Sequence, residues 1–188
     1  MNPSYFIFKI CNFIKYKNNM KNLIILTALV FIFGFIESEN TVFKSADGKT
    51  KITARADWLA AGNMKGVEIY ISHENKKTNF ISTIVVSKDE GLIEGTNLNS
   101  YSASKLFIQT AVLSSTPSFS GIKNVNGKLF KYYEYEYNNK DLIKMKTLVY
   151  HALQGLTGYQ MVITAHLNGF DQYKPMFNKI ANSLIIQP

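Results

Sequence analysis

The fold is decided by residues 119–137, which read FSGIKNVNGKLFKYYEYEY. Two extended runs, 119–125 and 129–137, lie on either side of Asn126-Gly127. Asn and Gly tolerate the positive φ angles that a type I′ turn needs at both central positions, and this turn joins adjacent antiparallel strands. The stretch therefore predicts a β-hairpin, which the flanking segments extend into a sheet.

The segments that follow the hairpin continue the antiparallel pattern. Residues 138–141 (NNKD) form the next predicted turn, and residues 142–150 form the next strand. Two glycines predict a loop over 153–158, after which 159–167 alternates again as the final strand. The spacing predicts an antiparallel meander.

A helix follows the last strand. The chain turns at Asn168-Gly169, and Pro175 fits the first turn of a helix, where its missing N–H leaves no bond unmade. The apolar side of this helix consists of Met176, Phe177, Ile180, Ala181 and Leu184. We expect that side to pack against the sheet.

Two more hairpins precede residue 119. One is predicted over 41–55, where Asp47-Gly48 supplies the turn. The other joins 67–72 to 80–86, across a polar loop that ends at Asn79.

A second helix lies between these hairpins and residue 119, capped by Asn97 or Asn99 and ending near Leu113. Its predicted packing stripe consists of Leu98, Tyr101, Ile108 and Val112. Many hairpin-linked strands with two helices define an α+β domain, in which helices cover an antiparallel sheet of hairpins.

The composition fits one globular domain. The 188 residues are 46% hydrophobic and include only 4 Pro, which excludes a disordered or fibrous chain. A single Cys excludes an internal disulfide and a cysteine zinc site. The formal charge of +8 would suit nucleic-acid binding, and the distribution of the charged residues along the chain decides whether this function is supported.

The first 38 residues are predicted to be a signal peptide. Residues 23–36 form an apolar run without a charge, preceded by Met20-Lys21 and followed by a short polar segment. The run is shorter than the roughly 20 residues that span a bilayer. Residues 1–19 are an unusual extension, so we expect translation to start at Met20. An extended basic region, or a second apolar piece that anchors the protein, is the alternative.

Cleavage after Ser38 leaves residues 39–188 as one mature domain. Its charge is 17 basic minus 12 acidic residues, or +5, because part of the basic excess belongs to the leader. Cys11 precedes the apolar run and cannot serve as a lipid-attachment cysteine, so the mature protein has no thiol. The lysines are scattered and Arg55 is the only Arg, which disfavours specific nucleic-acid binding.

The chain resembles a known superfamily over most of residues 41–186. The resemblance rests on segments that follow one another in order: Asp57-Trp58, Ile84-Val85-Val86, Asn97-Leu98-Asn99-Ser100-Tyr101, Val125-Asn126-Gly127, the strand 159–164, Tyr173-Lys174-Pro175-Met176-Phe177 and Ile180-Ala181-Asn182-Ser183-Leu184. This order is similar to the PsbP-like superfamily, which includes the PsbP proteins of photosystem II and the bacterial DcrB-like envelope proteins. The resemblance implies an α/β/α sandwich that acts as a non-enzymatic assembly factor, adaptor or envelope component.

One strand carries the candidate surface residues. The two-residue period of a strand places Tyr132, Glu134 and Glu136 on one face of 131–137 and a row of tyrosines on the other. The two carboxylates suit acid–base work or a hard cation, but a solvated face above a packed tyrosine row is the stronger interpretation. The tyrosine row consists of Tyr133, Tyr135 and Tyr137.

Trp58 completes the candidate partner surface, although buried packing between a strand and a helix is the stronger interpretation for a single Trp. His73, His151 and His166 are far apart, without metal-ligand spacing, and are expected at exposed or terminal strand positions. A Ser, His and Asp triad is possible only if its members meet in the fold. We expect no metal, no cofactor and no catalytic residue.

These observations predict an exported protein, periplasmic or extracellular, that binds another protein of the bacterial cell envelope without catalysis. An exported hydrolase whose residues assemble only in the fold is one alternative. A chaperone-like binder of apolar peptides is another. Membrane association is expected only if the leader is retained.

Overall fold

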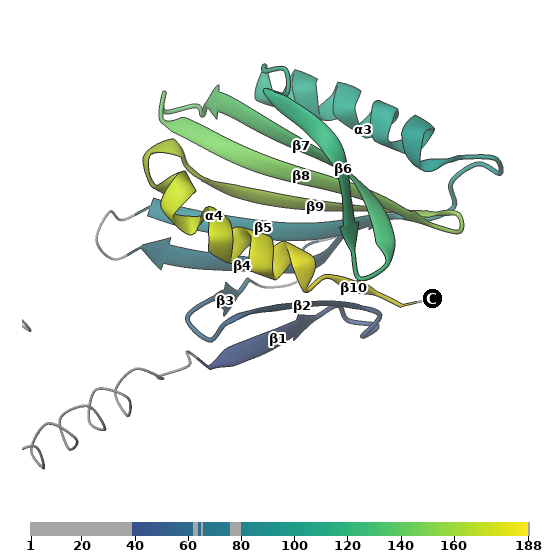
Figure 1. The fold of residues 1–188 in the computed structure, drawn as a ribbon, viewed down its shortest axis with the longest axis horizontal. Coiled ribbons are helices and arrows are strands. Elements are labelled where there is room, and N and C mark those ends of the chain that lie inside the picture. Colours follow the sequence, from purple (N-terminus) through teal and green to yellow (C-terminus); the bar gives the residue numbers. More distant parts are fainter. Residues whose placement is uncertain (1–38, 62–63, 65, 76–79, 188) are drawn as a thin grey trace, which may run out of the picture. The chain divides into compact units, whose positions relative to one another are not determined.

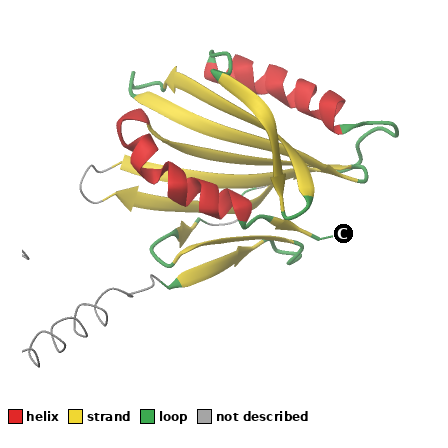
Figure 2. Cartoon of the chain, viewed as in Figure 1, coloured by secondary structure: helices red, strands yellow, loops and turns green. Residues whose placement is uncertain are grey.

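The computed structural model describes residues 39–61, 64, 66–75 and 80–187. In this part of the chain ten strands form two antiparallel sheets, and two helices pack on them (Figures 1 and 2). The predicted signal peptide, the Met20 start and Cys11 lie outside the described residues. The α+β fold class predicted from the hairpins is confirmed.

The larger sheet has seven strands in the spatial order β3-β4-β5-β9-β8-β7-β6, and each neighbouring pair is antiparallel. The strands are β3 (Leu59–Ala60), β4 (Val67–Asn75), β5 (Phe80–Asp89), β6 (Phe119–Val125), β7 (Lys128–Asn138), β8 (Lys144–Gln154) and β9 (Thr157–His166). The predicted meander is therefore β6 to β9, and β5 joins it through β9.

The smaller sheet has three strands in the order β1-β2-β10. They are β1 (Asn40–Lys44), β2 (Thr50–Arg55) and β10 (Ile185–Ile186). The predicted hairpin over 41–55 is confirmed as β1 and β2, with Gly48 at φ 72° in its turn. The sequence predicted no helix or strand after Leu184. In the structure this segment forms β10, which pairs with β2 on the side opposite to β1.

The Asn-Gly turn forms as predicted. Asn126 has φ 50° and Gly127 has φ 79°, the two positive values of a type I′ turn. The predicted loop over 153–158 is shorter than expected, because β8 runs to Gln154 and β9 begins at Thr157. Gly155, at φ 56°, supplies the positive φ that this two-residue hairpin turn requires.

The helices α3 (Leu98–Leu113) and α4 (Leu167–Asn182) pack on opposite faces of the larger sheet. Alternation along β8 decides this: Leu148 and Tyr150 join the core beneath α4, whereas Val149 joins the smaller cluster beneath α3. The smaller sheet contributes Ile52 to the α4 side. The predicted α/β/α sandwich is confirmed, with a second sheet added on one side.

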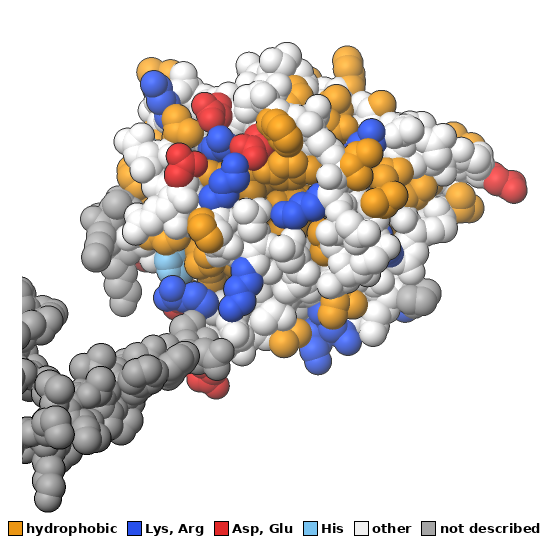
Figure 3. Space-filling view, viewed as in Figure 1, with side chains coloured by type: hydrophobic (Ala, Val, Ile, Leu, Met, Phe, Trp, Pro, Cys, Tyr) orange, Lys and Arg blue, Asp and Glu red, His pale blue; other side chains and the backbone are white. Residues whose placement is uncertain are grey.

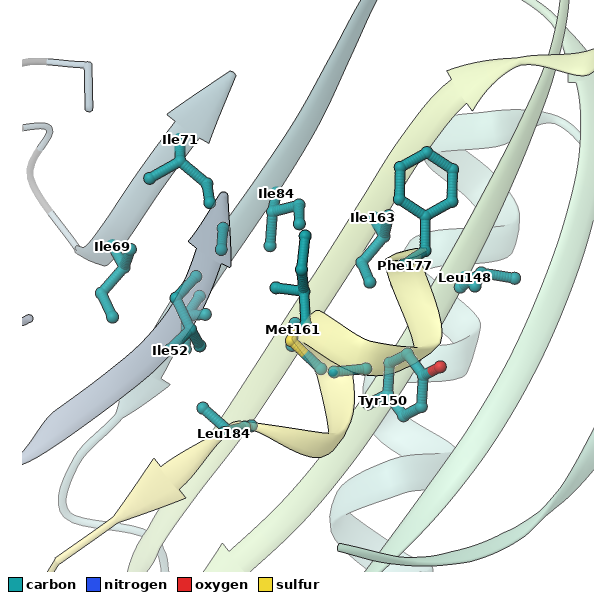
Figure 4. Packing of buried hydrophobic residues seen from close by; sticks show 14 of the residues in the cluster. Ile52, Ile69, Ile71, Ile84, Leu148, Tyr150, Met161, Ile163, Phe177 and Leu184 are labelled. Carbon is teal, nitrogen blue, oxygen red and sulfur yellow. The ribbon is translucent and has the colours of Figure 1, made fainter. Parts of the chain in front are cut away.

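The main core lies between the larger sheet, α4 and β2. Figure 4 shows Ile84, Met161 and Ile163 from the sheet directed toward Phe177 and Leu184 at the C-terminal part of the chain. Each of these side chains is at most 3% exposed. Burial of a large apolar side chain stabilises the fold by roughly 1.5–3 kcal/mol, so this layer supplies most of the folding free energy.

The start of α3 is as predicted, but its packing face is not. Asn97 is the N-cap: its side chain accepts hydrogen bonds from the backbone of Asn99 and Ser100 at 3.0 Å each. Tyr101 packs inward as expected, whereas Ile108 and Val112 are 54% and 73% exposed. The inward face consists of Tyr101, Ser102, Leu106 and Leu113. Because α3 is apolar on both sides, its periodicity could not identify the buried side.

The start of α4 was predicted wrongly. The helix begins at Leu167, capped by His166, so Asn168-Gly169 is its first turn and Pro175 lies in its interior. An interior Pro removes one helical hydrogen bond and costs about 3 kcal/mol. Phe170 and Phe177, both fully buried, pack at 5.3 Å between ring centroids and offset that cost.

Candidate functional site

Strand β7 separates the two rows of its side chains as the sequence predicts. Tyr133 and Tyr135 are buried beneath α3, with Tyr137 packed beside them, which confirms the packed tyrosine row. The opposite face is not solvated as predicted, because Glu134 is only 8% exposed. Lys174 of α4 reaches over this face and closes it.

Glu134 is held by three donors. Its Oε1 accepts from Lys174 Nζ at 3.0 Å and from the Tyr132 hydroxyl, and its Oε2 lies 3.1 Å from Lys146 Nζ. Burial by itself raises the pKa of Glu134, but the hydrogen bonds from Tyr132 and the two lysines outweigh it and hold the pKa below its usual value. The carboxylate is ionised and has no proton to donate near neutral pH.

Glu136 shares a lysine with Glu134. Its Oε1 lies 2.9 Å from Lys146 Nζ, which therefore bridges the two carboxylates. The Glu136 side chain is 47% exposed, in contrast to Glu134. The pair is thus an ion network that ties β7 to β8, and it does not have the separated acid and base that glycoside-type hydrolysis requires.

Two tyrosine rings lie beside this network, beneath a lysine. Lys123 of β6 extends over the rings of Tyr132 and Tyr150, with its Nζ 6.0 Å and 5.4 Å from the two centroids. It also donates to Asn178 Oδ1 of α4 at 3.2 Å. Figure 3 shows hydrophobic side chains between α4 and β6 with basic side chains around them.

Burial affects two polar groups at these rings, Lys123 and Tyr150. Burial, and then the charge of Lys174, lower the pKa of Lys123. The Tyr150 hydroxyl is buried and has no hydrogen-bond partner in the described part of the chain. Tyr150 is fully buried, so the groups that face outward are Lys123 and the partly exposed Tyr132 ring. A cation over an aromatic ring suits a carboxylate carried on an apolar group.

A Ser–His pair, which sequence analysis did not find, lies beneath α3. His151 Nδ1 is 2.9 Å from Ser102 Oγ, and Ser102 Oγ is 2.9 Å from the Tyr133 hydroxyl. His151 is fully buried and Ser102 is 1% exposed, so the prediction of an exposed strand end for His151 is wrong. The apolar run 148–153 around it was the available signal, since such a run indicates a strand buried on both faces.

The proton arrangement of this pair is the reverse of a catalytic one. Gln160 Nε2 donates to His151 Nε2 at 3.2 Å, so the neutral imidazole carries its proton on Nδ1 and donates it to Ser102. A catalytic imidazole instead accepts the serine proton. Burial, and then the charge of Lys105, lower the pKa of His151 to about 4, which keeps the ring neutral.

No carboxylate completes a triad at His151 in the residues that the structure describes. Asp89 is engaged elsewhere: it accepts from the Tyr101 hydroxyl at 2.7 Å and from Lys105 Nζ at 2.8 Å. The Ser102–His151 pair is therefore a sealed structural network between α3 and the sheet.

Trp58 cannot form part of a partner surface, because it is 2% exposed. Its ring lies 5.5 Å from that of His73, whose Nε2 is 3.3 Å from Asp57 Oδ2. The His73 side chain is only 16% exposed, which corrects its predicted exposed position. His166 does lie at a strand end, where its ring stacks on Phe80 at 3.7 Å.

The remaining candidate features lie away from these residues. A pocket of about 240 Å³ between β1, β3 and β4 is lined by both polar and apolar groups, including Lys44, Glu68 and Ile69. Within the described ranges, His, Cys, Asp and Glu side chains form no group of three that could hold a metal ion. Likewise, no helix among the described residues is long and apolar enough to cross a membrane.

The architecture defines the class of protein: an antiparallel sheet with a helix on each face, which is the PsbP-like fold. Cyanobacterial PsbP from Synechocystis sp. PCC 6803 matches at a TM-score of 0.56 and 11% identity, covering 81% of this chain and 95% of that one. LpqN of Mycobacterium tuberculosis, described as involved in cell envelope biogenesis, matches at 0.52 and 14%, covering 80% and 91%.

A third solved structure extends the likeness to a protein without a known role. PA94 of Pseudomonas aeruginosa, described as a putative regulator of unknown function, has a TM-score of 0.56 at 10% identity, covering 80% of this chain and 99% of that one. No family model and no curated protein sequence matches the chain. At such identities the likeness is one of fold.

Proposed function

We propose that this chain is an exported, non-enzymatic binding or adaptor module that binds a protein of the bacterial cell envelope. The PsbP-like fold supports the class of function, since LpqN shares it and is described as acting in envelope biogenesis. The apolar run 23–36 behind Met20-Lys21 supports export. The groups best suited to chemistry support binding over catalysis, because Ser102 and Glu134 are both held in closed networks.

The observation that carries the proposal is the uncovered surface of the β6–β7 hairpin. Phe119, Ile122 and Leu129 are 54%, 67% and 55% exposed, and β6 is the last strand of its sheet. The register places Phe119 on the same face as Lys123, and Ile122 and Leu129 on the opposite face. The Phe119 ring lies 5.9 Å from that of Tyr132, so this side of the hairpin continues to the ring beneath Lys123. Exposed apolar side chains on a free strand edge, beside a lysine, suit a protein segment that carries an acidic residue.

Site-specific photo-crosslinking in cells of the native host tests the proposal. A photo-reactive phenylalanine at position 119 should crosslink to one envelope protein, whereas the same residue at position 42, on β1, should not. Val42 is a matched control because it is 50% exposed. The change Lys123→Glu should abolish the crosslink. No specific adduct from position 119, or an adduct that Lys123→Glu leaves unchanged, would contradict the proposal.

A chaperone for apolar peptides is the second candidate, and the free edge of β6 favours it. In that function the hairpin binds many unfolded clients through backbone pairing and apolar contacts, with little dependence on Lys123. The same crosslinking experiment separates the two functions. Many adducts of different mass from position 119 indicate a chaperone, and a single adduct indicates an adaptor.

A further inference from the structure

Helix α3 leaves one whole side uncovered. Phe107, Ile108 and Val112 are 78%, 54% and 73% exposed on its outer face. Ala103, Ser104 and Ala111 are the smaller exposed residues of the same face. None of these six residues, which we call the α3 outer face, is charged. A helix that is apolar all round is normally covered on all sides.

Two polar side chains near the α3 outer face, Lys105 and Ser104, already have partners within the protein. Lys105, its one charged residue, pairs with Asp89 at 2.8 Å. The Ser104 hydroxyl donates to the carbonyl of Tyr101 at 2.7 Å within the helix itself. The α3 outer face can therefore be covered without leaving an unpaired hydrogen-bonding group on these two side chains.

The order of residues on this face is symmetric. The six positions form three pairs, 103 with 112, 104 with 111 and 107 with 108, and each pair is centred between residues 107 and 108. When two copies of α3 cross antiparallel on a two-fold axis through that midpoint, Ala103 faces Val112 and Ser104 faces Ala111 of the second copy. Phe107 faces Ile108 at the centre of the seam, and the small pairs on either side of them allow the close approach of packed helices. An uncharged face also brings no like charges together in a self-complementary contact.

The charges at the two ends of α3 are complementary. Exposed Glu94 lies in the loop before the helix, next to Ile93, which is 84% exposed. Beyond the other end lies the β7–β8 turn, with exposed Lys140 and Lys144 on either side of Leu142, which is 81% exposed. Asp141 is also exposed there, so residues 140–144 carry a net charge of +1. An antiparallel pair of helices brings the acidic end of one copy to the basic end of the other.

The position of that turn follows from the contacts of α3 with β7. Ser102 Oγ lies 2.9 Å from the Tyr133 hydroxyl, and Ser115 Oγ donates to the carbonyl of Glu136 at 2.8 Å. The helix and β7 therefore run in the same direction, so the turn after β7 lies past the C-terminal end of α3 (Figure 1).

We propose that the α3 outer face is a two-fold dimer interface, in which a second copy of this chain packs antiparallel against it. A 16-residue helix is about 24 Å long, so the seam buries on the order of a few hundred Å² per copy, below the ~800 Å² per partner of a standard interface. The dimer is accordingly concentration-dependent. Phe119 and Lys123 lie on the face of the larger sheet opposite to α3, so the dimer is separate from partner binding at these two residues.

Sedimentation velocity of the purified protein over about 1–200 µM tests the dimer. The sedimentation coefficient should rise from the monomer to the dimer value across this range. Phe107→Glu places two carboxylates near the two-fold axis and should keep the protein monomeric, with an unchanged circular dichroism spectrum and melting temperature. The matched change Val42→Glu should leave the dimer intact. A monomer at every concentration, or a dimer that tolerates Phe107→Glu, would overturn the proposal.

Charge reversal tests the antiparallel arrangement separately. Changing both Lys140 and Lys144 to Glu should weaken the dimer by about tenfold, because Glu94 of the second copy then meets like charges. Adding Glu94→Lys should restore it, which a purely structural effect of the first changes would not allow. Failure of the restoration would rule out the antiparallel order.

Discussion

His151 stabilises the fold only while its imidazole is neutral. Burial and Lys105 lower its pKa in the folded protein from 6.5 to about 4, whereas the unfolded chain titrates near the ordinary value. Between these values the unfolded chain binds a proton that the folded chain does not. The free energy of unfolding should therefore fall by up to about 3 kcal/mol as the pH drops from 6.5 to 4.

Urea unfolding at a series of pH values measures this effect. The variant His151→Gln keeps a hydrogen-bonding side chain but cannot take up the proton, so its stability should change less over the same range. Parallel profiles for the two proteins would mean that His151 is not the group responsible.

Glu134 holds two lysines that repel each other without it. Replacing it with Gln leaves Lys146 and Lys174 facing a neutral amide, and should lower the free energy of unfolding by about 2–3 kcal/mol. Glu136→Gln is the matched control. Its carboxylate is largely exposed, so the same change should cost less than about 1 kcal/mol. Equal losses in chemical denaturation would contradict the buried role of Glu134.

At the level of single residues, alternation predicted the two faces of β7 but not what covers them. Tyr135 was correctly assigned to a packed row. Glu134 was assigned to solvent because a local pattern does not reveal Lys174, which lies 40 positions away in the chain. Ser102 and His151, separated by 49 positions, were missed for the same reason.

The contact between α3 and β9 depends on a glycine. A Cβ at Gly158 would lie 2.3 Å from ring carbons of Tyr101, which packs directly above it. Gly158→Ala should therefore push α3 from the sheet and destabilise the protein by about 2 kcal/mol or more.

Gly121→Ala, on the exposed strand β6, is the control for this change. There a Cβ would meet only the far end of the Phe119 ring, at 3.3 Å, and the ring can move into solvent. Thermal melting should show a large loss for Gly158→Ala and a small change for Gly121→Ala. A Gly158→Ala variant as stable as the parent would show that α3 does not pack closely at this point.

At the level of elements, hairpins were predicted well because their turns are encoded locally. Asn126-Gly127 is the clearest case. Helices were predicted less well because two of their features depend on distant contacts. The buried side of α3 was missed because both sides are apolar. The first two turns of α4 were missed because packing of Phe170 offsets the presence of Pro175 within the helix.

At the level of the whole molecule, the sandwich forms because both faces of the larger sheet are apolar, and each face is covered by one helix. What the sequence could not predict is the small sheet, because β10 is only two residues long and pairs with β2, more than 130 positions earlier. The same arrangement leaves the β6–β7 hairpin and the α3 outer face uncovered, while Ser102, His151 and Glu134 are enclosed. Surfaces for binding are thus on the outside, and the groups suited to catalysis are inside.

Reaction with a serine-directed fluorophosphonate tests most directly whether Ser102 is enclosed and unreactive. The folded protein, followed by intact mass spectrometry beside a serine protease as positive control, should show no adduct. Ser102 is hydrogen-bonded to the Tyr133 hydroxyl and to His151, and it is closed to solvent, so a reagent cannot reach it. A stoichiometric adduct on Ser102 that disappears in His151→Gln would contradict the account and identify a hydrolase.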